Sequence, residues 1–229
     1  MVPQRHDLVR VSPADWEEML AATPTLAKLP PPARQLLDDW ARRDWPAIVR
    51  RRSGEEAPEA LPLGVPLPPS LGKLRIGLTL PAGRPWTSTE PPDLAVARPA
   101  APAGWLSAID ALIHLGRDCG AAPRPFGALL WGAVTGLAYL RPESDLDLLW
   151  PVTRDTDLVR LLDGIAQIDA AGTLRLDGEI LLADGAGVQW RELARARHHP
   201  ASEVMTKAMQ GLSLRPAASL LPGQRIRTS

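Results

Sequence analysis

Two stretches without hydrophobic periodicity constrain the fold of this chain more than any other feature of its sequence. Pro, Gly, Ala and Glu accumulate from Ser53 to Ser70 and again from Pro81 to Gly104. Pro lacks a backbone N–H, and Gly loses much conformational entropy when its backbone is fixed. We therefore expect neither stretch to form the interior of a helix or strand. We therefore place the domain boundary in the second stretch. This predicts an N-terminal domain over residues 1–95, a second domain over 104–215 and a C-terminal tail over 216–229.

The N-terminal region predicts a small α+β domain. Ser12 followed by Pro13 is typical of a helix N-cap with Pro at the first helical position, and a second helix is expected after Pro31. The segments 46–50 and 73–80 alternate between apolar and other residues, as strands do.

The second region alternates in type and predicts a larger α+β domain with a mixed sheet and flanking helices. An amphipathic helix is expected over 105–115, because its apolar residues recur at helical spacing. The elements expected after it are an apolar run over 126–140, a strand over 144–150, a helix over 156–168, and strands over 173–182 and 188–190.

Composition excludes several classes of protein. Of the 229 residues, 45% are hydrophobic and 23% charged, which is usual for a globular protein with a buried core. Acidic and basic residues balance at 26 each, so no global field attracts nucleic acid or an anionic membrane. The chain shows no signal-peptide pattern and no apolar run of about 18 residues, so we expect a cytoplasmic protein. The single cysteine, Cys119, rules out an intramolecular disulfide.

A pair of carboxylates carries the strongest chemical signal. Side chains alternate along a strand, so Asp145 and Asp147 project to one face while Leu146 and Leu148 anchor the other. Two like charges this close repel each other unless a cation lies between them. Carboxylate oxygens suit Mg²⁺ or Mn²⁺, which can bind phosphate oxygens during an in-line displacement. The alternative is that the two aspartates end a strand at a solvated loop.

Two further positions support the metal interpretation. Gly127 lies where a strand would end and a helix begin, and a glycine there lets backbone N–H groups approach a phosphate. In the segment 174–182, Asp177 and Glu179 share one face by alternation and offer a third carboxylate. The alternative for Asp177-Gly178 is a tight hairpin turn.

The segments that carry these residues resemble a known family. FGALLW at 126–131 followed by SDLDLL at 144–149 is similar to the glycine and D-x-D signature of the DNA polymerase β-like nucleotidyltransferase superfamily. Over roughly residues 5–212 the chain resembles the phosphoribosyl-dephospho-CoA transferases of malonate decarboxylase, also called holo-[acyl-carrier-protein] synthases. The further matching segments are RHDLV, GVPLP, GKLRIGL, TGLAYL, LDGEILLADG and VQWREL.

The resemblance implies a bacterial enzyme with a nucleotidyltransferase-like fold and a defined reaction. A serine of the acyl carrier protein subunit attacks the α-phosphate of 2'-(5''-triphosphoribosyl)-3'-dephospho-CoA and releases diphosphate, with Mg²⁺ or Mn²⁺ as cofactor and neither nucleic acid nor membrane as partner. It assigns Asp145, Asp147 and Asp177 as catalytic residues and metal ligands, with Glu179 as the competing assignment for the third ligand. Alternatives are a related transferase with another acceptor, or a non-catalytic adaptor that binds the carrier protein.

One residue departs from the superfamily pattern, and the phosphate-binding cations stay open. Ala128 replaces the serine that usually follows the glycine, so only the backbone N–H groups of Gly127 and Ala128 are left to bind the leaving diphosphate. Basic side chains must also meet the triphosphate. The candidates are Lys73, Arg75, Arg124 and Arg191, each of which is alternatively a solvated surface charge. Period two places Lys73 and Arg75 on one strand face.

Overall fold

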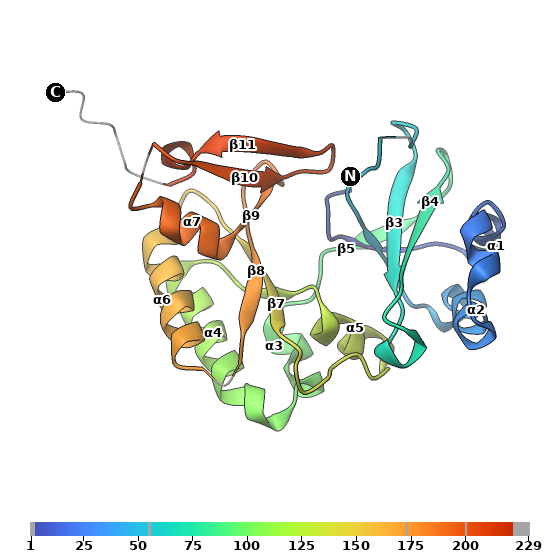
Figure 1. Cartoon of the computed structure of the whole chain (residues 1–229), viewed down its shortest axis with the longest axis horizontal. Coiled ribbons are helices and arrows are strands. Elements are labelled where there is room, and N and C mark those ends of the chain that lie inside the picture. The colour runs from blue at the N-terminus through green and yellow to red at the C-terminus, as the bar shows by residue number, and fades with distance from the viewer. Residues whose placement is uncertain (1–2, 55, 173, 200, 222–229) are drawn as a thin grey trace. The chain divides into compact units, whose positions relative to one another are not determined.

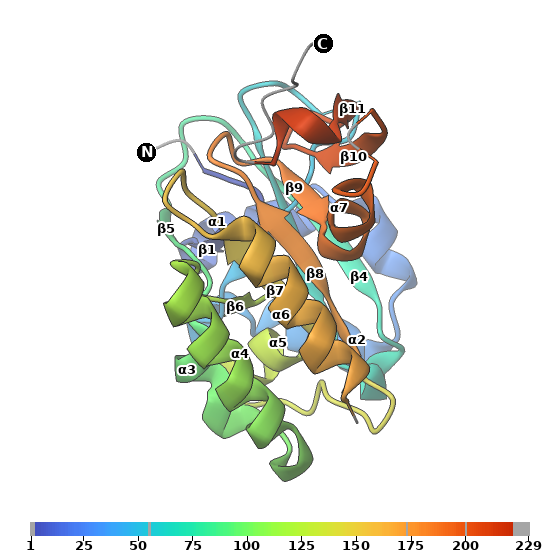
Figure 2. The ribbon, with the colours of Figure 1, turned by 90° about the vertical axis from the view of Figure 1, so that its left-hand side faces the viewer.

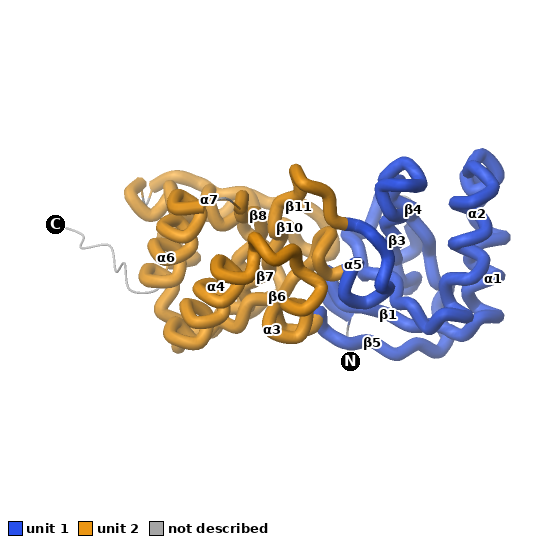
Figure 3. The backbone as a smooth tube through the Cα atoms, turned by 90° about the horizontal axis from the view of Figure 1, so that it is seen from below, with its two compact units in different colours: residues 1–91, 131–139 blue, residues 92–130, 140–229 orange. Residues whose placement is uncertain are grey.

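The computed structural model describes residues 3–54, 56–172, 174–199 and 201–221, and it has the α+β architecture that the sequence predicts. Two mixed helix-and-sheet units are distinguished in Figure 3. Unit 1 comprises residues 1–91 together with 131–139, and unit 2 comprises 92–130 together with 140–229. The change at 91 falls inside the stretch where the sequence places the boundary. The return of 131–139 to unit 1 was not predicted.

Unit 1 contains an antiparallel sheet with strand order β4-β3-β2-β1-β5. Its helices are α1 (Pro13–Ala21) and α2 (Pro31–Asp38), and its strands are β1 (Leu8–Arg10), β2 (Ala47–Val49), β3 (Leu61–Pro66), β4 (Arg75–Leu80) and β5 (Thr87–Thr89). The predicted N-cap is confirmed, because the hydroxyl of Ser12 accepts a hydrogen bond from the backbone N–H of Asp15 at 3.1 Å.

Strands β3 and β5 lie in stretches that the sequence assigned to loops, and that assignment was wrong. In β3 the apolar residues Leu61, Leu63 and Val65 alternate and are buried, although Pro62 and Gly64 separate them. A proline cannot donate to a neighbouring strand, but its carbonyl still accepts. The carbonyl of Pro62 accepts from the N–H of Arg50 at 3.1 Å.

The loop after β2 is held by one partly buried carboxylate. Glu56 accepts hydrogen bonds from the guanidinium of Arg50 at 3.0 Å, from the N–H of Ser53 at 2.7 Å and from the hydroxyl of Thr79 at 2.9 Å. Burial opposes the ionisation of this group, but the donors, led by Arg50, outweigh it and lower the pKa of Glu56 to about 2. The ionised side chain therefore stabilises unit 1.

Unit 2 contains a mixed sheet with strand order β11-β10-β9-β8-β7-β6, in which β7 and β8 are parallel and the other pairs antiparallel. The strands are β6 (Arg124–Pro125), β7 (Leu146–Pro151), β8 (Leu176–Leu181), β9 (Gly187–Gln189), β10 (Glu203–Lys207) and β11 (Leu212–Pro216). The helices are α3 (Leu94–Ala97), α4 (Leu106–Cys119), α5 (Ala128–Thr135), α6 (Leu158–Ala170) and α7 (Trp190–Ala196). The unit division falls inside α5, after Leu130.

Helices α4 and α6 pack together in the core on one face of this sheet. Leu148, Trp150, Ile180 and Val188 point into the core on that face, where α4 and α6 run side by side (Figures 1 and 2). The opposite face is the one on which alternation places the aspartates of β7 and β8. The fold thus anchors the two strands by their leucines and leaves their carboxylates on the other side.

Several predicted elements of unit 2 are confirmed and others shift. The helices over 105–115 and 156–168 and the strand over 144–150 are present, whereas Trp190, predicted to end a strand, begins α7. Strands β10 and β11 were not predicted. The strand predicted over 173–182 is β8, but Thr173 lies outside the described residues.

The C-terminal region is only partly described. In the segment assigned to a tail, residues 217–219 form a single helical turn in which Ala217 is fully buried. Residues 222–229 of that predicted tail lie outside the described residues. No helix formed by the described residues combines the length and apolar character that crossing a bilayer requires.

Candidate active site

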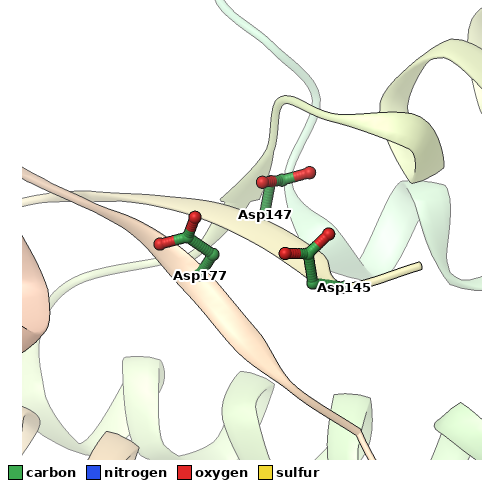
Figure 4. A group of neighbouring side chains, drawn as sticks. All are labelled: Asp145, Asp147 and Asp177. Atoms are coloured by element: carbon green, nitrogen blue, oxygen red, sulfur yellow. The ribbon is translucent and has the colours of Figure 1, made fainter. Parts of the chain in front are cut away.

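Three carboxylates meet on the face of the unit 2 sheet opposite α4 and α6. Asp147 on β7 is directly opposite Asp177 on the parallel strand β8, and Asp145 immediately precedes β7 (Figure 4). Each offers a carboxylate oxygen, and these oxygens lie within 4.8 Å of one another. All three side chains are partly exposed to solvent. The structure therefore brings together the pair and the third acid that strand alternation predicts.

The connection between the two strands explains this meeting. Parallel strands need a crossover, and α6 provides it between β7 and β8. The crossover returns the chain in the same direction, so Asp177 comes beside Asp147 although 30 positions separate them in sequence.

Arg175 is a cationic partner of the cluster that the sequence reasoning missed. A guanidinium nitrogen of Arg175 lies 2.7 Å from Oδ2 of Asp145, and the Arg175 side chain is 73% exposed. The hydrogen bond with Asp145 raises the pKa of Arg175 above its ordinary value. Period two could have found this residue, since Arg175 comes two positions before Asp177.

Gly127 has a steric role that was not predicted. A Cβ atom at this position would lie 1.7 Å from Oδ2 and 2.5 Å from Cγ of Asp147. The backbone N–H of Phe126 also donates to the carbonyl of Asp147 at 3.2 Å. Only glycine therefore allows the segment before α5 to pack this closely against the Asp147 carboxylate.

Gly178 sits within β8, so the alternative of a hairpin turn at Asp177-Gly178 was wrong. Its φ is +143°, a conformation that L side chains rarely adopt. An added Cβ would lie 1.9 Å from the carbonyl oxygen of Leu148 on β7. Gly178 is therefore needed for the close approach of the two strands beside the cluster.

Asp177 rather than Glu179 is the third member of the cluster. Oδ1 of Asp177 accepts hydrogen bonds from the N–H of Gly178 at 2.7 Å and from Nε2 of Gln189 at 3.2 Å. Glu179 is 5% exposed, and its carboxylate lies 3.0 Å from Nζ of Lys207 on β10. The geometry thus favours Asp177 as the ligand. The sequence reasoning missed Gln189, which lies at the end of β9, the strand that pairs with β8.

Two of the predicted phosphate-binding cations lie in unit 2 and make ion pairs there. Arg124 on β6 has its Nε 3.5 Å from Asp93. Arg191 donates to Asp169 at 2.9 Å and to the carbonyl of Leu176 at 2.7 Å, and the pairing lowers the pKa of Asp169. Arg191 therefore anchors β8 to α7 and α6, which is a structural role that the surface-charge alternative did not include.

The other two predicted cations, Lys73 and Arg75, lie in unit 1 and are exposed. The prediction that they share a strand face was wrong. Lys73 has a φ of +54° and precedes β4, which begins at Arg75, so strand alternation does not relate the two side chains. Ala128, at the start of α5, confirms that a helix begins directly after Gly127.

Comparison with known proteins identifies the family. The family described as phosphoribosyl-dephospho-CoA transferase MdcG N-terminal domain matches residues 4–91, and the corresponding C-terminal domain family matches residues 93–218. The chain belongs to the phosphoribosyl-dephospho-CoA transferase family. It is therefore a transferase, and the cluster of unit 2 lies within the C-terminal domain of the family.

Curated relatives agree over most of their length. A phosphoribosyl-dephospho-CoA transferase of Bradyrhizobium diazoefficiens is 41% identical over 212 residues, which cover 93% of this chain and 89% of the relative. Enzymes of the same name from Xanthomonas euvesicatoria and Xanthomonas campestris are 37% and 38% identical over 84% and 85% of this chain, and 88% and 89% of the relatives. No solved structure matches the chain.

Proposed function

We propose that this enzyme transfers the 2'-(5''-phosphoribosyl)-3'-dephospho-CoA group from its triphosphoribosyl precursor to a serine of the acyl carrier protein subunit of malonate decarboxylase. The observation that carries the proposal is the group of three aspartate oxygens within 4.8 Å, in a chain of this transferase family. Three carboxylates this close together fit a site that holds a divalent metal against the phosphates of a substrate. We place the reaction at Asp145, Asp147 and Asp177.

The residues at this site fit Mg²⁺ or Mn²⁺. The donors are carboxylate oxygens from β7, from the residue before it and from the adjacent β8, and oxygen ligands of this kind are those that both ions prefer. Gly127 leaves the space in which the Asp147 carboxylate sits, and a single methyl group would close it. When bound, the metal would supply positive charge that offsets the charges of the carboxylates and the triphosphate.

The proposed reaction is a single displacement at phosphorus. The serine oxygen of the carrier forms a bond to the α-phosphorus, and the bond from that phosphorus to the oxygen bridging the β-phosphorus breaks. Diphosphate leaves with the bridging oxygen and its electron pair. The proton of the serine hydroxyl passes to Asp177, which we assign as proton acceptor as well as ligand. The backbone N–H groups at Gly127 and Ala128 are assigned to the leaving diphosphate, since they begin a helix.

The mass of the carrier protein tests this proposal. The purified enzyme is incubated with the apo carrier subunit, the triphosphoribosyl precursor and Mg²⁺ or Mn²⁺, and the carrier is analysed by intact-mass spectrometry. We expect one phosphoribosyl-dephospho-CoA group on the wild-type carrier and none on a carrier whose acceptor serine is replaced by alanine. An unmodified carrier in every metal condition would overturn the proposal. Modification only with ATP, by the mass of AMP, would indicate a different donor.

Variants of the cluster test where the reaction takes place. Asp145→Ala and Asp147→Ala should each lower turnover by about two to three orders of magnitude, the scale of losing transition-state charge stabilisation. Asp155→Ala, which removes an exposed carboxylate from the same unit, is the matched control and should leave turnover unchanged. Equal activity of all three variants would exclude the cluster as the site.

A further inference from the structure

Gln189 joins the proposed metal ligand to the helix that follows it. At the end of β9 its side chain makes two hydrogen bonds, one with each end of the amide. Oε1 accepts from the backbone N–H of Glu192 at 2.9 Å and so caps α7, while Nε2 donates to Oδ1 of Asp177 at 3.2 Å. Gln189 therefore connects the N-terminus of α7 to the carboxylate cluster.

The cap determines which end of the amide faces Asp177. The oxygen and nitrogen of a glutamine amide are interchangeable by shape, so a neighbouring group must decide between them. A backbone N–H can only donate, so the atom that meets Glu192 must be Oε1. Nε2 is then turned to the carboxylate, where it can only donate. The cap of α7 therefore sets this orientation without any contribution from a ligand.

The first turn of α7 is itself firmly anchored, so the cap is a rigid reference point. Arg191 is bound to Asp169 and to the carbonyl of Leu176, the residue directly before Asp177. The carboxylate of Glu192 accepts from the N–H of Met205 on β10 at 2.8 Å. Helix α7 is therefore held against β8 on one side and β10 on the other.

Both hydrogen bonds to Asp177 use the same oxygen. Gly178 N–H and Gln189 Nε2 donate to Oδ1, and no hydrogen bond from the described residues reaches Oδ2. Two anchored donors on one oxygen fix the rotation of the carboxylate about its Cβ–Cγ bond. The other oxygen, Oδ2, therefore points in one fixed direction.

We propose that Gln189 is a positioning residue, which holds the Asp177 carboxylate through Oδ1 so that Oδ2 is available to the divalent metal. This inference rests on the proposed function, because it assumes that the cluster binds the metal. Gln189 itself would not touch metal or substrate. Partners of metal ligands in such positions typically change metal affinity or activity by about 10- to 100-fold when they are lost.

The variant Gln189→Ser separates the two roles of the side chain. Serine is a favourable N-cap, so Gln189→Ser keeps an acceptor for the N–H of Glu192 but is too short to donate to Asp177. Gln189→Ala removes both contacts. Gln189→Glu is a second variant that keeps the acceptor and loses the donor. Gln167→Ser, an exposed position on α6, is the matched control.

The readout is Mn²⁺ binding to the protein without substrate, measured by calorimetry and by the electron paramagnetic resonance signal of free Mn²⁺. We expect Gln189→Ser and Gln189→Glu to weaken binding by about tenfold or more while the unfolding temperature of Gln189→Ser stays near that of the wild type. Gln167→Ser should bind as the wild type does. High Mn²⁺ should restore much of the turnover of Gln189→Ser.

The outcomes distinguish failure of this inference from failure of the proposed function. If wild-type protein binds Mn²⁺ and Asp145→Ala abolishes it, but Gln189→Ser binds within twofold of wild type, then Gln189 only caps α7 and the inference is wrong. If wild-type protein binds no Mn²⁺ at the cluster, the proposed metal site is wrong and this inference falls with it.

Discussion

A single methyl group at position 127 should inactivate the enzyme while leaving its fold intact. In Gly127→Ala the new Cβ would lie 1.7 Å from Oδ2 of Asp147, and protein Cβ atoms essentially never approach a neighbour within 3.0 Å. The Asp147 carboxylate must therefore shift by about 1.3 Å or the chain before α5 must retreat by as much. A misplacement of about 1 Å in a catalytic group can reduce the rate about 100-fold. We expect kcat/KM to fall by at least that factor, or about 3 kcal/mol in the activation free energy.

The assay for this variant is the initial rate of carrier modification, followed by intact mass, together with thermal unfolding. The matched control is Gly132→Ala in α5, the helix that follows Gly127, where an added Cβ would lie 3.7 Å from the carbonyl of Leu137, an ordinary contact. That control should keep full activity and gain about 0.5–1 kcal/mol in stability, as helix interiors do when Ala replaces Gly.

Activity of Gly127→Ala within threefold of the wild type would refute the reasoning, because it would mean that the reaction does not depend on the position of Asp147. A fall in activity that is equally large in Gly132→Ala would also refute it. That result would mean that activity responds to any change in or beside α5 and not to the contact between position 127 and Asp147.

Three further predictions concern strand approach, the third ligand and pH. Gly178→Ala should lower the free energy of unfolding by about 3 kcal/mol or more, seen in urea titration, because it combines a strained φ with a backbone clash. Asp177→Asn should reduce turnover about 100- to 1,000-fold at saturating substrate, whereas Glu179→Gln should mainly reduce stability; the reverse ranking would exchange their roles. The pKa of Glu56 is lowered from 4.5 to about 2 in the folded chain, so the ionised side chain contributes about 3 kcal/mol to the free energy of unfolding. This contribution is present above pH 4.5 and is lost as the pH falls toward 2. Glu56→Gln should flatten this part of the stability profile, and an unchanged acid limb would disprove the contribution.

The sequence predicts the carboxylates well because strand alternation is a local rule. Asp145 and Asp147 needed only a period of two and a neighbouring run of leucines to be placed on one face. Asp177 needed an alternating segment of the same kind. What alternation does not specify is which strands are neighbours, since the crossover through α6 is a property of the whole domain.

The parts that escaped prediction depend on contacts between distant segments. The steric role of Gly127 exists only because the backbone before α5 packs on Asp147, and the role of Gln189 only because β9 returns beside β8. Strand β3 was missed for a different reason, since its prolines concealed an alternating apolar pattern that is buried in the structure.

The assignment of residues 131–139 to unit 1 has a practical consequence for dissecting this enzyme. Within that unit the ring of Trp131 lies 6.0 Å from that of Trp40, and the hydroxyl of Tyr139 donates to the carbonyl of Pro66 at 2.8 Å. A fragment that stops at residue 91 would leave out both side chains and uncover apolar surface that they bury. Such a fragment should aggregate or unfold, and adding residues 131–139 as a peptide in trans should restore a cooperative melting transition.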